Sequence, residues 1–306
     1  MMTDKYDSAG SGSISFFIRE PAGEAKGIVQ FVHGIAEHSG RYERFAEYLA
    51  EHGYMTASED HMGHGASVSE ACPLGCVRGG WDAMVSDVNE LTRRLRESRP
   101  DLQLFLFGHS MGSFLARTCL YTYPDSGIRG AVISGTAWQP GAVLAAGKLM
   151  CRAEILRHGA DRPSEFLENM MFGAYSRQFG DGASPNDWIN SLREEVELYT
   201  NDPLCGFTAS GGMILSMMEG LIRNQKKDNL SKMPRSLPVL FIAGDRDPVG
   251  ANGKGVRRCF EEFGKAGMTD TEIKLYPGAR HEVLNEKCRL QVYDDILAWL
   301  DAYARR

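Results

Sequence analysis

The chain has 306 residues, of which 43% are hydrophobic and 24% charged, and its formal net charge is −6 at pH 7. This is enough apolar material for one large core, or for a core with an added lobe. The acidic balance, with both signs mixed along the chain and no basic stripe, excludes nucleic acid as an expected partner.

The first 15 residues, MMTDKYDSAGSGSIS, are polar and rich in glycine and serine. They have neither the basic nor the apolar region of a secretory signal, so we expect a cytoplasmic protein, with residues 1–13 forming a flexible N-terminus. The seven cysteines are scattered among mostly apolar neighbours, which predicts reduced thiols rather than disulfides. Cys72 and Cys76 are the one close pair, and without a second pair nearby they do not predict a zinc site.

Short, dense apolar runs alternate with stretches of helical spacing along most of the chain. Runs without clean alternation are typical of strands that are covered on both faces. The predicted strands are residues 27–34, 54–58, 102–108, 130–135, 237–244 and 272–276. The predicted helices are residues 41–53, 81–98, 111–124, 255–267 and 290–304. This order indicates an α/β fold with a mainly parallel central sheet and helices on both faces.

The alternation stops between about Ala137 and Arg235, where the pattern is helical throughout. Because this stretch stands between two core strands, we interpret residues 138–235 as an inserted helical cap. The core is then made of residues 14–137 and 236–306. No apolar segment approaches the length that spans a bilayer.

The pentapeptide Gly108-His109-Ser110-Met111-Gly112 follows a predicted strand and opens a predicted helix. That context raises the G-x-S-x-G pattern above chance, because a nucleophilic serine needs a sharp turn that lifts it off the strand end. Glycines on both sides let the backbone turn closely against its neighbours. We therefore predict that Ser110 is a nucleophile.

A serine hydroxyl needs a base to take its proton and a carboxylate to orient that base. In this architecture the order along the chain is serine, acid, histidine, and His158 and His281 are the histidines that follow Ser110. His158 lies in the helical insertion, whereas His281 follows a strand through a Pro-Gly loop, so we predict His281 as the base.

Two aspartates follow the strand at 237–244, and either is suitably placed at the strand end. We favour Asp247 as the acid, because it lies far enough along the loop to reach the histidine loop. Asp245 is closer to the strand end, where it can cap loop amides instead. The oxyanion formed by attack needs two backbone N–H donors, for which we predict Met111, after the nucleophile, and Ile35, in the loop after an early strand.

Two other patterns have simpler interpretations. A group of acidic and histidine side chains near residues 33–64 could suggest a metal, but its spacing and its glycine do not fit a helix that presents two ligands. We expect these residues instead to hydrogen-bond the oxyanion loop and the loop that carries Asp60. They are His33, Glu37, His38, Asp60, His61 and His64. The methionine-rich stretch at 213–222 is most simply a helix face packed on the core, and the alternative is an adaptable lining for an acyl chain.

Five motifs in this order, HGIAEHSGRY, EDHMGHGAS, GHSMG, GDRDPV and ARHEV, resemble the α/β-hydrolase family of monoacylglycerol lipases and bacterial lysophospholipase-like enzymes. The resemblance extends from about residue 14 to residue 303. It implies a triad of Ser110, Asp247 and His281, an oxyanion hole at Ile35 and Met111, no cofactor or metal, and a cap over an acyl-binding tunnel. The implied substrate is a small lipid ester. An exposed apolar face on the cap would allow transient contact with a membrane surface.

Other functions fit the same residues. An acyltransferase or an amide or peptide hydrolase would use the same triad, because the cap rather than the triad selects the substrate. A non-catalytic binding protein of this fold is the third alternative. The sequence leaves open the acyl-chain length, the head group, the oligomeric state and the role of the cap segment from Asn201 to Phe207.

Overall fold

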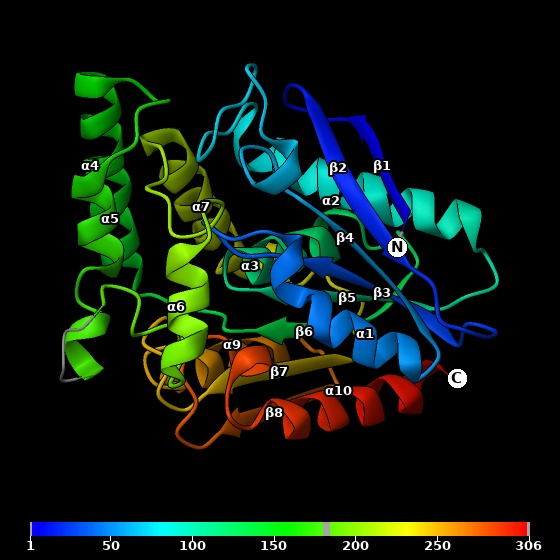
Figure 1. Ribbon diagram of the computed structural model, residues 1–306. Coiled ribbons are helices and arrows are strands. Elements are labelled where there is room, and N and C mark those ends of the chain that lie inside the picture. Colours follow the sequence, from blue (N-terminus) through cyan, green and yellow to red (C-terminus); the bar gives the residue numbers. More distant parts are fainter. Residues whose placement is uncertain (1, 180–183, 305–306) are drawn as a thin grey trace.

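The computed structural model describes residues 2–179 and 184–304, and within these ranges eight strands form one sheet in the order β1-β2-β4-β3-β5-β6-β7-β8 (Figure 1). The strands are β1 (Met2–Asp7), β2 (Ser13–Arg19), β3 (Gly27–Val32), β4 (Tyr54–Glu59), β5 (Leu104–His109), β6 (Ile128–Ser134), β7 (Val239–Gly244) and β8 (Thr271–Tyr276). The pairs from β4 through β8 are parallel, while β1 with β2 and β2 with β4 are antiparallel. The predicted fold class is confirmed.

Helices cover both faces of the sheet. Successive strand residues point to opposite sides, so strands that are apolar throughout need helices packed on each face. In β5, Leu104 and Leu106 belong to the core on one face, and Phe105 and Phe107 to the core on the other. Helices α2 (Gly80–Ser98), α3 (Met111–Thr122) and α9 (Lys254–Lys265) pack on the first face. Helices α1 (Glu43–Glu51) and α10 (Arg289–Ala304) pack on the second.

The prediction that residues 1–13 form a flexible N-terminus is wrong for residues 2–13, the part that the structure describes. Strand β1 pairs with β2 from Met2 opposite Ile18 to Asp7 opposite Ser13. The Tyr6 hydroxyl donates to a carboxylate oxygen of Glu59 at 2.5 Å, and Asp87 accepts hydrogen bonds from the turn that follows β1. An edge strand is held by its backbone, so a polar composition did not reveal it.

The helical insertion between β6 and β7 contains α4 (Gly141–His158), α5 (Glu165–Phe172), α6 (Arg193–Asn201), α7 (Gly211–Asn224) and α8 (Lys227–Leu230). Figure 1 shows α4 and α5 farthest from the sheet, with α6 and α7 between them and the core. Helix α7 is fixed to α3 by buried hydrogen bonds, in which the Thr118 hydroxyl donates to the Asn224 side chain at 2.9 Å and the Asn224 amide donates to the Phe114 carbonyl at 2.8 Å. We call residues 138–235 the cap segment.

Two further expectations concern the cysteines and membrane-spanning helices. The seven cysteines, all within the described ranges, form no disulfide, as predicted, and Cys288 is the one that is not fully buried. Among the described residues, no helix is both long and apolar enough to cross a membrane.

Candidate active site

Ser110 lies between the end of β5 and the first residue of α3, and its backbone has φ 52° and ψ −122°. A positive φ is costly for a residue with a side chain, and it persists where the surroundings enforce it. Two residues further on, Gly112 packs so closely against the end of β3 that a side chain there would overlap the Val32 carbonyl oxygen. The serine is therefore held on a strained turn, half-buried at the strand end.

His281 and Asp247 come from the loops after β8 and β7, which neighbour one another in the sheet. His281 Nδ1 and Asp247 Oδ2 are 2.9 Å apart, and both side chains are buried. The other carboxylate oxygen of Asp247 accepts the Val249 N–H at 2.9 Å, which fixes the orientation of the carboxylate. Asp245 accepts the Gly278 N–H at 2.7 Å, so it caps the histidine loop.

His281 Nε2 is buried, and the described part of the chain gives it no hydrogen-bond partner. The ring lies between His109 and Trp188, with centroid separations of 4.6 Å and 5.1 Å. Because Nδ1–H donates to Asp247, the neutral ring keeps its lone pair on Nε2. His281 and Ser110 line the same cavity, so this nitrogen is available to accept a proton there.

The charge of Asp247 controls when His281 is neutral. Burial, the largest influence, lowers the pKa of His281, but the Asp247 charge and hydrogen bond raise it, and the net shift is upward. A base must be neutral, so we expect kcat/KM for ester hydrolysis to fall as the pH decreases through a midpoint above about 6.5. Asp247→Asn removes the charge and should move the midpoint of its residual activity downward, whereas Asp245→Asn should not. A wild-type midpoint well below 6.5 would contradict this assignment.

The loop after β3 reaches the serine. A side chain added at Gly34 would lie 3.0 Å from Ser110 Cβ, and Ile35 lines the cavity next to Ser110. Met111 is the first residue of α3, so its N–H has no partner within the helix. The structure thus places both predicted oxyanion donors on the two segments that flank Ser110.

Buried polar side chains hold this loop. Glu37 accepts hydrogen bonds from the Gly34 N–H and from the Tyr42 hydroxyl, and His64 Nε2 accepts the Ala36 N–H at 3.3 Å. Asp60 accepts the Ser39 N–H at 2.8 Å. These contacts agree with the structural role predicted for the histidine and acidic residues near 33–64. Burial, followed by the charge of Glu282, raises the pKa of Glu37 to about 7.

A cavity of about 380 Å³ opens over Ser110 and His281. Most of its walls come from the cap segment, with an apolar group formed by Phe172, Trp188, Ile189, Phe207 and Ile214. Met213, Met217 and Met218 are buried in the core and do not line it. The three methionines therefore pack in the core, which is the simpler of the two interpretations, while Ile214 of the same stretch lines the cavity.

Trp188 and Tyr199 line the cavity but are not among the residues predicted for this site. Each lies in a predicted helical stretch whose apolar residues also fit ordinary packing. Nothing in the local pattern distinguishes an aromatic side chain that faces a cavity from one that faces the core.

Comparison with known proteins gives a consistent family. A family model described as Hydrolase_4, serine aminopeptidase S33, matches residues 23–288. The monoacylglycerol lipase of Mycolicibacterium smegmatis is 27% identical over 96% of this chain and 95% of its own length. The monoglyceride lipase of Mus musculus is 27% identical over 87% of this chain and 79% of its own.

A solved structure of a thermostable carboxyl esterase from Bacillus coagulans, in complex with glycerol, superposes with a TM-score of 0.90 at 28% identity. The match covers 99% of this chain and 98% of that one. The chain therefore belongs to the Hydrolase_4 family of α/β hydrolases, as an ester hydrolase of the monoacylglycerol lipase-like type.

Proposed function

We propose that this chain is a serine hydrolase that cleaves carboxylic esters of single-chain glycerolipids, monoacylglycerols or lysophospholipids, through an acyl-enzyme on Ser110. The observation that carries the proposal is the buried His281 Nε2, which no described residue hydrogen-bonds, in the cavity that Ser110 lines, with Asp247 bonded to the opposite nitrogen. This is the arrangement that general-base activation of a hydroxyl needs.

In the first half-reaction, Ser110 Oγ attacks the ester carbonyl carbon while His281 Nε2 takes the hydroxyl proton. The N–H groups of Ile35 and Met111 stabilise the negative charge on the carbonyl oxygen. The tetrahedral intermediate then breaks the bond to the alcohol, and His281 returns the proton to the leaving oxygen. Water repeats these steps on the acyl-enzyme and releases the fatty acid, so the side chains and backbone of this chain supply every step without a cofactor.

The walls of the cavity support a lipid substrate. Its volume of about 380 Å³ is in the range of sites for small molecules, and its apolar group of cap residues suits an acyl chain. Relatives named as monoacylglycerol and monoglyceride lipases, and an esterase solved with glycerol, make a glycerol ester the first choice.

The test is fatty acid release from a matched panel: monoacylglycerols of short to long chain, lysophosphatidylcholine and an acyl amide. We expect a clear preference for a long-chain monoacylglycerol or lysophospholipid. Activity limited to short or activated esters would contradict a lipid substrate. Faster cleavage of the amide would favour the peptidase activity for which the family model is named, and preferential transfer of the acyl group to added glycerol would favour an acyltransferase.

The outer face of the cap segment suits brief contact with a lipid surface. Leu149 and Leu156 lie one heptad apart on α4 and are 69% and 87% exposed, and Phe166 on α5 is 54% exposed. Arg157, in the last turn of α4, adds positive charge near this apolar face, while Arg152 lies 4.0 Å from Glu219. Exposed apolar side chains beside basic ones favour an anionic membrane surface.

This contact predicts that the protein floats with vesicles that contain an anionic phospholipid. The double variant Leu149→Glu with Leu156→Glu should lose flotation and retain hydrolysis of a water-soluble short-chain ester, because α4 does not line the cavity. Equal flotation of variant and wild type, or no flotation of either, would contradict membrane contact through this face.

A further inference from the structure

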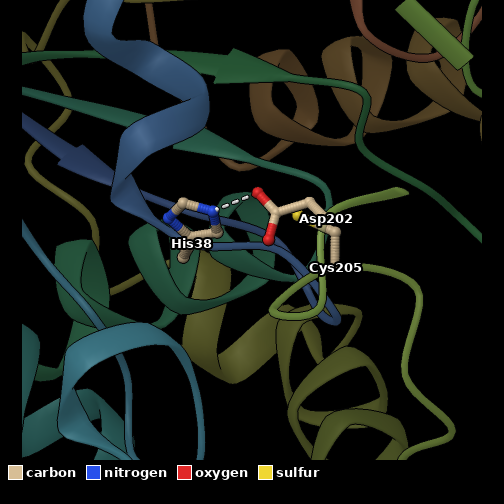
Figure 2. A group of neighbouring side chains, drawn as sticks. All are labelled: His38, Asp202 and Cys205. Carbon is tan, nitrogen blue, oxygen red and sulfur yellow. Dashed lines mark hydrogen bonds and ion pairs between the residues drawn. The ribbon is translucent and has the colours of Figure 1, made fainter. Parts of the chain in front are cut away.

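The turn that follows α6 reaches across from the cap segment to the loop after β3. Figure 2 shows His38 of that loop and Asp202 of the turn pointing toward one another, with Cys205 beside Asp202. This turn, Asn201 to Phe207, is the part of the cap segment whose role the sequence leaves open. Two of its residues, Asp202 and Gly206, hydrogen-bond to residues that follow the proposed oxyanion donor Ile35.

The Ala36 carbonyl oxygen accepts two hydrogen bonds from the cap segment. One comes from the Gly206 N–H at 2.9 Å and the other from the Tyr199 hydroxyl at 2.8 Å. Ala36 has a positive φ of 55°, a conformation that its own side chain disfavours. Bonds from another part of the chain are therefore suited to holding it.

The same loop is fixed at its other polar groups. Glu37 accepts the Gly34 N–H, and His64 accepts the Ala36 N–H. Across Gly34, Ile35 and Ala36, the Ile35 N–H is the donor for which the described part of the chain offers no acceptor. The contacts from the cap segment thus complete a loop in which one N–H is left for a ligand.

The pair His38 and Asp202 adds a third contact. His38 Nε2 lies 2.9 Å from Asp202 Oδ2, and His38 Nδ1 accepts the Gly40 N–H at 3.2 Å. Because Nδ1 is an acceptor, the proton of the neutral ring is on Nε2 and is donated to Asp202. The ligand atoms of His38, Asp202 and Cys205 lie within 4.8 Å of one another. In this tautomer, however, both ring nitrogens of His38 are used in hydrogen bonds and neither has a free lone pair for a metal, so we interpret the group as a hydrogen-bonded contact.

We propose that Tyr199 and the Asp202–Gly206 turn are positioning residues that couple the cap segment to the oxyanion loop and aim the Ile35 N–H at the reacting carbonyl oxygen. The inference rests on the proposed function. Tyr199 and Gly206 also line the cavity, so an acyl chain bound there contacts the same groups that hold the loop. Displacement of the turn would leave substrate binding possible but would weaken stabilisation of the transition state.

The test compares Tyr199→Phe with wild type on the preferred ester of the panel. This change removes the hydroxyl bond to Ala36 and leaves the ring that lines the cavity. We expect kcat to fall about tenfold with KM nearly unchanged, which is less than the roughly 10²-fold loss for complete removal of an oxyanion donor. An alkyl boronic acid, whose boron takes the place of the carbonyl carbon and becomes tetrahedral when Ser110 adds to it, should bind more weakly by the same factor. A non-hydrolysable ether analogue of the substrate should bind equally well.

Asp202 provides a second, independent comparison. Asp202→Asn keeps an oxygen that can accept the His38 N–H and should stay near wild type, whereas Asp202→Ala should lose kcat as Tyr199→Phe does. The matched control is Glu197→Gln, which breaks an exposed 2.9 Å ion pair with Arg193 on the same helix and does not touch the loop. It should change neither kcat nor the affinity for the boronic acid.

The outcomes separate this inference from the proposed function. If Tyr199→Phe and Asp202→Ala keep wild-type kcat and boronic acid affinity in an active enzyme, the positioning role is wrong and the hydrolase remains. If both variants weaken the ether analogue as much as the boronic acid, their role is merely structural and the inference is also overturned. If wild type shows no Ser110-dependent hydrolysis, the proposed function itself fails.

Discussion

Ser110→Ala should reduce fatty acid release by about 10⁶-fold, the scale of loss seen when a serine nucleophile is removed from a triad. The reason is chemical: without Oγ there is no acyl-enzyme, and His281 can only assist a misplaced water. The fold should survive, because alanine removes one atom from a half-buried side chain whose strained backbone is held by its neighbours. The measurement is the initial rate on the preferred ester, with thermal unfolding as the check on folding.

Ser216→Ala is the matched control for this loss. Ser216 is a buried serine whose hydroxyl donates to the Gly212 carbonyl at 2.8 Å within α7, away from the cavity lining. We expect it to keep wild-type activity. A fluorophosphonate should label wild type and Ser216→Ala but not Ser110→Ala. Full activity in Ser110→Ala would overturn the proposed mechanism, and failure to label well-folded wild type would favour the non-catalytic binding protein.

The core strands could be predicted because burial on both faces leaves an unmistakable pattern. Residues 104–107 are apolar without interruption, since the side chains alternate between two cores rather than between core and solvent. β1 carries no such pattern. Of its residues only Tyr6 is buried, and the strand is held by backbone pairing with β2. A polar sequence at the edge of a sheet looks like a loop until its partner is known.

The residues of the candidate site also differ in how far the local sequence reveals them. The turn around Ser110 has a local signature, because its glycines answer a steric demand a few residues away. The contacts of Tyr199 and Asp202 join positions 163 and 164 residues apart, and neither residue type nor local spacing indicates the partner. The positions of triad candidates can therefore be proposed from sequence, whereas the cap contacts that hold the oxyanion loop required the structure.

Asp247→Asn should lower kcat by about 10⁴-fold, the scale measured when a triad aspartate is replaced by its amide. Asparagine presents an N–H₂ where the carboxylate accepted two bonds, from His281 Nδ1 and from the Val249 N–H. His281 can then form a bond to the amide oxygen or turn its lone pair toward the amide donor. In the second arrangement His281 carries its proton on Nε2, and this nitrogen can then no longer accept the proton of Ser110.

Asp245→Asn is the natural comparison, since the two aspartates lie two residues apart in one loop. Asp245 accepts the Gly278 N–H at 2.7 Å, and the amide oxygen of asparagine can accept the same bond. We therefore expect less than a tenfold change in kcat for Asp245→Asn, with the pH midpoint of kcat/KM unchanged. Comparable losses in the two variants would mean that the loop as a whole, rather than the Asp247 carboxylate, supports His281. A larger loss in Asp245→Asn than in Asp247→Asn would contradict the assignment of Asp247 as the acid.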